Sequence, residues 1–255
     1  MGRVGLELRG TAAVITLQGE DGGHRLSAAM AREIELTLQA AQVKDGVRAV
    51  ILQGAGDHFS VGADLKERAS LPPEEWVRHH RPFEDLALAL QEVPQPTIAA
   101  VSGWALGGGA ELALGCDIVV AAPDARFGQP EAVRGLIPGM GGPQFLQRRL
   151  PQGLAAYLLY TGATMAAEEA LQAGLVTFLA PDPLTRALAI ADEIAKASPV
   201  AVGALCRLLR RSPGEFRAAY AQELDAWREA VASGDAIEGA RAFMEKRAPN
   251  YRDLG

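Results

Sequence analysis

Glu111 is a candidate catalytic residue, because it follows closely on three consecutive glycines at positions 107–109. Glycines let a backbone turn sharply and bring its N–H groups close to a ligand. A helix that begins among them would present free N–H groups and the positive end of its dipole. Gly108 would then offer a donor to a developing oxyanion, and Glu111, on the same turn, a general base. A tight strand–helix turn with a solvated glutamate fits the pattern equally well.

A second carboxylate, Glu131, follows twenty residues later, directly after Pro130 in a largely apolar segment. A single buried carboxylate usually has a bonding partner in the fold and serves a structural role. Two carboxylates that converge on a glycine-built donor site indicate acid–base chemistry with an oxyanion hole. The spacing alone does not show that Glu111 and Glu131 converge.

Alternating strand and helix patterns must position these residues. Short β-branched or apolar runs predict strands at 4–9, 13–17, 47–52, 97–101 and 117–121. Amphipathic patterns predict helices at 27–42, capped by Ser27, and at 73–92, which Pro82 should kink or divide. This order favours βαβ units and a mainly parallel sheet. The last third predicts helices at 155–160, 166–173, 184–196, 201–210, 215–232 and 237–246, with one strand at 175–179.

Composition narrows the class of protein. The 255 residues are 49% hydrophobic and carry a formal net charge of −6, which argues against a general binder of nucleic acid or anionic membranes. Cys116 and Cys206 lie far apart without metal-ligand spacing, so we expect neither a disulfide framework nor a zinc site. The first residues lack the apolar core of a signal peptide, and no apolar run reaches 18 residues. We therefore expect a cytoplasmic protein without membrane spans.

Six stretches, in this order, resemble the enoyl-CoA hydratase/isomerase (crotonase) family over nearly the whole chain. They are FSVGADLK at 59–66, VSGWALGGGAEL at 101–112, FGQPE at 127–131, IPGMGG at 137–142, TG at 161–162 and FMEKR at 243–247. The resemblance implies an α/β fold, a ClpP-like spiral of ββα units over residues 1–195. It also implies a helical region at 196–255 that builds a homotrimer or a dimer of trimers. Members act on acyl-CoA thioesters, and we expect no metal or redox cofactor.

The resemblance also implies roles for the site residues. The backbone N–H groups of Ala63 and Gly108 would bind the thioester carbonyl oxygen as an enolate develops. In a hydratase, Glu111 would be the base toward water and Glu131 the acid that protonates C2, while the N–H of Gly139 helps to hold the water. Isomerases of the family rely on an acid at the Glu131 position alone. Having both glutamates favours the hydratase, with an isomerase or other acyl-CoA chemistry as the alternative.

Basic side chains should meet the phosphates of coenzyme A. Lys66 and Lys246, two of only four lysines, match family positions near the nucleotide end. The family usually carries RPKxLNAL after the second strand, whereas this chain has GEDGGHRL at 19–26. Asp21 stands about where a lysine that binds coenzyme A is common, and Arg25 is a candidate to replace that contact. Trp104 either shapes the acyl pocket or packs beneath the turn.

Other polar side chains fit surface positions better than catalytic ones. His79 and His80 lie beside arginines on a predicted helix, and His58 lies in a turn cluster, so we expect solvated histidines. Arg207, Arg210, Arg211 and Arg217 form the clearest basic cluster. Some family relatives bind RNA, which makes this cluster the basis of a non-enzymatic alternative. The acidic net charge favours a solvated or intersubunit face instead.

Overall fold

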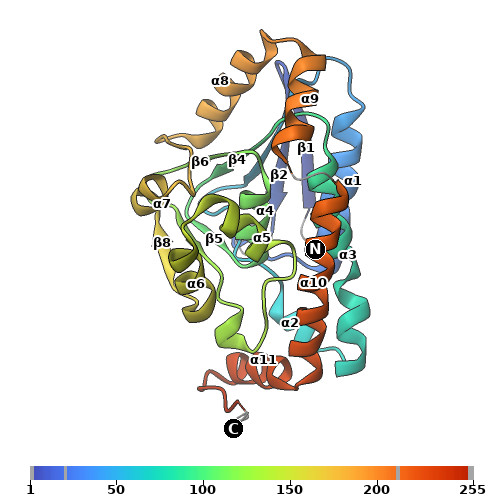
Figure 1. Ribbon diagram of the computed structural model, residues 1–255, viewed down its shortest axis with the longest axis vertical. Coiled ribbons are helices and arrows are strands. Elements are labelled where there is room, and N and C mark those ends of the chain that lie inside the picture. Colours follow the sequence, from blue (N-terminus) through green and yellow to red (C-terminus); the bar gives the residue numbers. More distant parts are fainter. Residues whose placement is uncertain (1–2, 20–21, 211–212, 252–255) are drawn as a thin grey trace.

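A six-stranded sheet forms the centre of the computed structural model, which describes residues 3–19, 22–210 and 213–251 (Figure 1). The strand order is β1 (Arg3–Arg9), β2 (Ala12–Gln18), β3 (Ala49–Gly54), β4 (Thr97–Val101), β6 (Ile118–Ala121) and β9 (Phe178–Leu179). Only β1 and β2 pair antiparallel, and each later strand pairs parallel with its neighbour. The predicted mainly parallel sheet is therefore confirmed.

Each central strand serves two apolar cores, because successive side chains point to opposite faces of a sheet. In β4, Ala99 and Val101 pack in the core that includes α1 (Ala28–Gln42) and α3 (Trp76–Glu92). Ile98 packs on the other face, against α8 (Pro183–Ala195). In Figure 1, α1 and α3 accordingly cover one side of the sheet. Burial on both faces explains why these strands are continuous apolar runs in the sequence.

A smaller sheet carries the segments that lead into the candidate site. It consists of β5 (Trp104–Leu106), β7 (Arg126–Gly128) and β8 (Thr164–Ala166), with β5 parallel to β7 and β7 antiparallel to β8. Helix α4 (Gly108–Gly115) begins directly after β5. Three-residue strands are too short to show alternation, and the sequence did not predict this sheet.

The remaining helices surround the two sheets. They are α2 (Leu65–Ala69), η1 (Pro73–Glu75), η2 (Ala132–Arg134), α5 (Gly142–Arg149), α6 (Gln152–Thr161), α7 (Ala167–Ala173), α9 (Pro199–Leu209), α10 (Pro213–Ala232) and α11 (Asp235–Glu245). The predicted C-terminal helices are confirmed within a few residues. Helix α5 was not predicted because Gly141 and Gly142 have the composition of a turn. Among the residues that the structure describes, no helix combines the length and apolar character needed to cross a membrane.

The C-terminal helices pack on the core as well as on each other. Helix α10 runs back beside α3 (Figure 1), and its Trp227 packs in one cluster with Trp76 and Leu136. The division of the chain at residue 195 stays a prediction.

Pro82 does not divide its helix, because α3 continues through it from Trp76 to Glu92, and the expected kink stays a prediction. A proline inside a helix leaves the carbonyl four residues earlier without its usual donor. That residue is Arg78, which is exposed, and Pro82 itself is only half-buried. Water can bond to the freed carbonyl, so the helix tolerates the proline at this position.

Candidate active site

Glu111 lies on the first turn of α4, and its carboxylate receives N–H groups from the start of another helix. Its Oε1 accepts hydrogen bonds from the N–H groups of Met140 at 2.7 Å and of Gly142 at 2.8 Å. Gly142 is the first residue of α5, so the carboxylate lies at the positive end of that helix dipole. Glu111 is therefore buried, not the solvated glutamate of the alternative interpretation. The two N–H groups favour its ionised form.

Glu131 precedes the short helix η2 and enters the same cavity in a different environment. Its Oε1 lies so close to Gly107 that a Cβ added to this glycine would be 2.5 Å away. Its Oε2 is buried and has no hydrogen-bond partner among the described residues. A buried, unpartnered oxygen favours the protonated form of a carboxyl group, which supplies its own donor.

The pKa values of both glutamates are raised, for causes that differ. Burial raises the pKa of Glu111, and the N–H groups of Met140, Gly142 and Gly139 oppose that effect. Burial also raises the pKa of Glu131, and the nearby charge of Glu111 raises it further. When two close carboxyl groups share protons, the group with more donors ionises first. The geometry therefore keeps Glu111 ionised while Glu131 retains its proton.

Two backbone N–H groups face the carboxylates from the other side. Hydrogen bonds of 2.9 Å join Leu26 N to Gly62 O and Asp64 N to Leu26 O, and they leave the Ala63 N–H between them without an acceptor in the described chain. The N–H of Gly108, first residue of α4, has no acceptor there either. An added Cβ on Gly108 would lie 3.8 Å from Ala63 N, so the two donors are close. Such paired donors are what an oxyanion hole requires.

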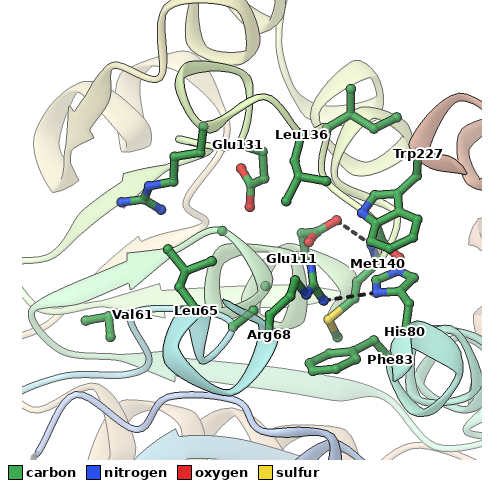
Figure 2. A pocket seen from close by; sticks show the side chains of 17 residues that line it. Val61, Leu65, Arg68, His80, Phe83, Glu111, Glu131, Leu136, Met140 and Trp227 are labelled. Carbon is green, nitrogen blue, oxygen red and sulfur yellow. Dashed lines mark hydrogen bonds between the residues drawn. The ribbon is translucent and has the colours of Figure 1, made fainter. Parts of the chain in front are cut away.

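All five predicted central residues line one enclosed cavity of about 50 Å³, namely Ala63, Gly108, Glu111, Glu131 and Gly139. Figure 2 shows Glu111 and Glu131 projecting into it from separate segments. Among the described residues, no cluster of histidine, cysteine and acidic side chains could hold a metal ion. The structure thus brings the predicted N–H donors and the two glutamates together around one cavity.

His80 was expected to be solvated, and that expectation is wrong. Its side chain is buried and lines the cavity, stacked between Phe83 at 5.5 Å and Trp227 at 4.2 Å between ring centroids. Trp76, His80 and Phe83 follow helical spacing on the buried face of α3. That spacing was the signal that could have identified His80, but its neighbouring arginines suggested a solvated face.

A shell behind Glu111 holds the backbone of residues 139–142 in place. The carbonyl of Gly139 accepts hydrogen bonds from His80 Nε2 at 2.9 Å and from the Tyr220 hydroxyl at 2.6 Å. Gly141 N donates to Oε1 of Glu223 at 2.7 Å. Burial and the charge of Glu111 raise the pKa of Glu223 well above its usual range. Tyr220 and Glu223, on α10, were not predicted, because no local motif marks them.

The predicted contacts to coenzyme A lie outside this cavity. Lys66 is exposed on α2 and lines a pocket of about 480 Å³ with Arg241 and Met244. Lys246 is exposed at the end of α11, and Arg25 is exposed before α1. Their roles stay predictions.

Trp104, at the start of β5, is 37% exposed and does not line the cavity. The first of its two suggested roles, shaping the acyl pocket, is therefore not supported by its position. His58, expected to be solvated, is half-buried beside it, and its Nδ1 accepts from Trp104 N at 3.4 Å.

His24 anchors the loop at 19–26, the segment whose sequence departs from the family pattern. His24 is buried, with its Nδ1 accepting from Gly19 N at 2.8 Å and its Nε2 bonded to the carbonyl of Ala55 at 2.6 Å. Asp21, in the same loop, lies outside the described residues. The substitution of His24 for the usual asparagine thus has a structural consequence at this position.

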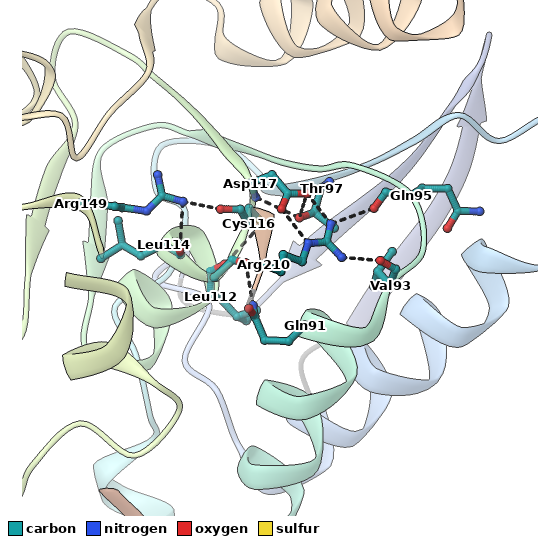
Figure 3. Close-up of polar contacts among 11 residues, drawn as sticks. Gln91, Val93, Gln95, Thr97, Leu112, Leu114, Cys116, Asp117, Arg149 and Arg210 are labelled. Atoms are coloured by element: carbon teal, nitrogen blue, oxygen red, sulfur yellow. Dashed lines mark hydrogen bonds and ion pairs between the residues drawn. The ribbon is translucent and has the colours of Figure 1, made fainter. Parts of the chain in front are cut away.

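The basic cluster was expected to form a solvated or intersubunit face, and Arg210 departs from this expectation while Arg207 is exposed. Arg210 is buried and forms an ion pair with Asp117, and it donates to the carbonyls of Val93 and Gln95 (Figure 3). Arg217 pairs with Glu92 at the surface, and Arg211 lies outside the described residues. Because Arg210 is bonded in the interior, it does not contribute to a basic surface that could bind RNA.

Comparison with known proteins agrees with this geometry. A family model described as enoyl-CoA hydratase/isomerase matches residues 7–254. The 2,3-dehydroadipyl-CoA hydratase of Escherichia coli strain K12 is 37% identical over 242 residues, covering 94% of each chain. The short-chain-enoyl-CoA hydratase of Clostridium acetobutylicum is 36% identical over 246 residues, covering 95% of this chain and 94% of the other.

Solved structures show the same relationship. A crystal structure of carnitinyl-CoA hydratase from Mycobacterium avium superposes with a TM-score of 0.88 at 36% identity, covering 98% of both chains. The predicted crotonase fold, with helices at its C-terminal end, is confirmed by these structures and by the arrangement of strands and helices. The chain belongs to the enoyl-CoA hydratase/isomerase family.

Proposed function

We propose that this protein is an enoyl-CoA hydratase, which adds water across the 2,3 double bond of a trans-2-enoyl-CoA. The observation that carries this proposal is the unequal pair of glutamate carboxyl groups in one cavity, facing two N–H donors that have no acceptor among the described residues. An ionised base beside a protonated acid is what the addition of water to a conjugated thioester requires. Relatives named as enoyl-CoA hydratases support the same reaction.

The reaction follows from the positions of the groups. The thioester oxygen accepts hydrogen bonds from the N–H groups of Ala63 and Gly108, which stabilise negative charge as it develops there. Glu111 takes a proton from a water molecule while the water oxygen bonds to C3. The electron pair of the double bond moves toward the thioester, and Glu131 gives its proton to C2. The product is a 3-hydroxyacyl-CoA. Glu111 then holds the proton from water and Glu131 is ionised, so one proton must pass from Glu111 to Glu131 before the next cycle.

In this proposal the residues outside the cavity bind the substrate and take no part in the chemical steps. Lys66, Lys246 and Arg25 are the proposed contacts to the phosphates of coenzyme A, and the exposed position of each permits them. The N–H of Gly139 faces Glu111, where it can help to hold the attacking water. The proposed reaction uses no metal or redox cofactor.

Assembly and compartment are also proposals. A homotrimer or a dimer of trimers would cover apolar side chains that the single chain leaves exposed on α9, among them Val200, Leu205 and Leu208. Cys116 and Cys206 are both free thiols, as in proteins of a reducing compartment such as the cytoplasm.

An isomerase is the second candidate, because Glu131 alone could move a proton between carbons of a 3-enoyl-CoA. A substitution of Glu111 distinguishes between the two reactions. We expect Glu111→Gln to lower kcat for hydration of crotonyl-CoA about 10³-fold, since the general base is removed. Isomerisation by the same variant should largely survive if the protein is an isomerase.

Loss of the 2-enoyl thioester absorbance measures hydration directly, with crotonyl-CoA and longer analogues as substrates. Glu84→Gln is the matched control, because Glu84 is also a buried glutamate but does not line the cavity. We expect it to retain activity within about threefold. Absence of hydration at every chain length would refute the proposed reaction.

A further inference from the structure

One peptide bond joins side chains of the interior to the carboxylate of Glu111. The N–H of this peptide belongs to Met140 and donates to Oε1 of Glu111 at 2.7 Å. Its carbonyl belongs to Gly139 and accepts from side chains of α3 and α10. Because the carbonyl and the N–H of one peptide share its resonance, a hydrogen bond to the oxygen makes the N–H a stronger donor. Groups that bond to the Gly139 carbonyl therefore act on Glu111.

Two side chains donate to the Gly139 carbonyl. Nε2 of His80 lies 2.9 Å from the oxygen, and the hydroxyl of Tyr220 lies 2.6 Å from it. A carbonyl oxygen has two lone pairs, so both can accept. His80 and Tyr220 are both buried, and a hydrogen bond in the interior is electrostatically stronger than one in water. The peptide is therefore polarised toward Glu111.

Two neighbours fix the proton of His80 on Nε2. A guanidinium can only donate, and Nη2 of Arg68, a buried residue of α2, lies 3.3 Å from Nδ1 of His80 (Figure 2). The Gly139 carbonyl, at Nε2, can only accept. Stacking on Phe83 and Trp227 holds the plane of the ring. Burial, and next the charge of Arg68, lower the pKa of His80 to about 3, so the ring stays neutral and remains a donor.

The titratable and charged groups that act on Glu111 come from several elements. They are Arg68 on α2, His80 on α3, Glu131 before η2, and Tyr220 and Glu223 on α10. Arg68 and the two glutamates can act through their own charge, so replacing them does not isolate the effect of the peptide. His80 is neutral, and burial raises the pKa of Tyr220, so that the phenol is neutral too. Both can be replaced without removing a charge.

We propose that His80 and Tyr220 are positioning residues for the general base, and that their hydrogen bonds polarise the Gly139–Met140 peptide bond and so keep Glu111 ionised. The role of Glu111 as base rests on the proposed hydratase function, whereas the hydrogen-bond chain does not. Without the two donors, the Met140 N–H would stabilise the carboxylate less. A larger fraction of the protein would then hold Glu111 in the protonated form, which cannot accept a proton from water.

The Gly139–Met140 peptide can be observed by itself, because a glycine is followed by a methionine only once in the sequence. Labelling glycine with ¹³C at the carbonyl and methionine with ¹⁵N gives one NMR signal for this peptide. Its amide proton shift should follow the ionisation of Glu111 as the pH is raised. The midpoint of this titration is the measurement, and it requires no substrate.

We expect Tyr220→Phe to raise the midpoint by about 0.3 pH units, because cooperative strengthening amounts to about 10–30% per hydrogen bond. This variant removes one oxygen atom and keeps the ring stacked on Phe216, so the fold should persist. His80→Phe keeps an aromatic ring between Phe83 and Trp227 but removes the other donor. It should raise the midpoint as well, and the double variant should raise it further.

Gln91→Met is the matched control. Gln91 is buried and donates to the carbonyl of Gly115 at 2.9 Å, but it does not line the cavity. We expect this variant to keep the midpoint of the unaltered protein. In the kinetic counterpart, the acid limb of kcat/KM for crotonyl-CoA should move toward higher pH in Tyr220→Phe, by the same amount as the NMR midpoint.

An unchanged midpoint in both Tyr220→Phe and the double variant would overturn the inference. An equal movement in Gln91→Met would also overturn it, because the loss of any buried donor would then be sufficient. So would a proton on Nδ1 of His80, which ¹⁵N-labelled histidine would reveal. A raised midpoint in a protein that hydrates no enoyl-CoA would refute the proposed reaction and support the hydrogen-bond chain.

Discussion

Arg68 and Arg210 are both buried, yet they lie in regions built in opposite ways. Arg210 pairs with Asp117, donates to two backbone carbonyls and is closed in by helix and strand ends (Figure 3). Arg68 has one neutral partner, His80, and a buried Nε without any in the described chain (Figure 2). Bonded partners compensate for the burial of Arg210, so removing one of them leaves a charge unpaired, whereas Arg68 has no bonded counter-ion to lose.

The pKa values of the two arginines express the same difference. Burial lowers the pKa of Arg68 to about 10, because no bonded carboxylate compensates for the lost water. Burial also lowers the pKa of Arg210, but the hydrogen bonds and charge of Asp117 reverse the direction and raise it. Equal burial therefore indicates nothing about function until the partners of the charge are known.

The largest effect on stability should come from the satisfied arginine. Arg210→Met leaves the half-buried carboxylate of Asp117 bonded, within the described part of the chain, to Thr97 alone, at 2.8 Å from N and 3.1 Å from Oγ1. Removing one member of a buried ion pair destabilises by about 3–5 kcal/mol. Urea unfolding followed by circular dichroism measures this loss. A loss below about 1 kcal/mol would show that the pair does not stabilise the fold as its geometry indicates.

The cavity should set the pH dependence of the rate, and the Arg210 region should not. Burial raises the pKa of Glu111 to about 7 and, with the charge of Glu111, that of Glu131 to about 8. Below the lower value the base is protonated, and above the higher value the acid has lost its proton. We expect a narrow bell-shaped profile of kcat/KM, with about 100-fold loss at pH 5. A flat profile of kcat/KM between pH 5 and 9 would contradict this assignment. The control variant Arg210→Met should keep the bell-shaped profile.

A methyl group at Gly107 should disturb the cavity and not the fold at large. Gly107 has φ of +51°, and its added Cβ would lie 2.5 Å from Oε1 of Glu131. We expect Gly107→Ala to lower kcat about 10- to 100-fold, because the acid is displaced. Gly46→Ala is the control, since Gly46 has φ of +77° but nothing within 4 Å of the added Cβ. Both variants carry backbone strain, so equal kcat values would disprove the role of the contact.

The smallest effect should come from an arginine at the surface. Arg217 pairs with Glu92, and both side chains are about half exposed. Exposed pairs contribute about 0–1 kcal/mol. Arg217→Ala should therefore change the free energy of unfolding by less than about 1 kcal/mol at low salt, and by less still at high salt. A larger loss would mean that exposure does not separate this arginine from Arg210.

Local patterns predicted much of the fold and the centre of the site. Ser27 was recognised as a helix cap, and its Oγ accepts from Met30 N at 3.1 Å. The apolar run at 97–101 matches β4. Gly108 and Glu111 share one turn, as their spacing indicated. These features depend on neighbours within four residues, which a sequence displays directly.

The features that were missed depend on distant segments. Nothing near Arg68 in sequence shows that Trp227 will cover it, and nothing near Arg210 shows that Asp117 will meet it. A charged side chain is usually exposed, so a solvated or intersubunit face was expected for the cluster with Arg210, and Arg68 was not singled out. Only tertiary packing decides which charges are enclosed. His80 differs, because helical spacing with Trp76 and Phe83 already marked its buried face.

The contribution of α10 to the cavity has a consequence for synthesis on the ribosome. Both glutamates and the glycine turn emerge long before Tyr220, which donates to the Gly139 carbonyl, and Trp227, which lines the cavity. Domains form largely as their segments emerge, with long-range contacts made last. A nascent chain whose α10 has not yet left the ribosome therefore holds both glutamates in an incomplete cavity. Competence to bind an acyl chain is acquired near the end of translation.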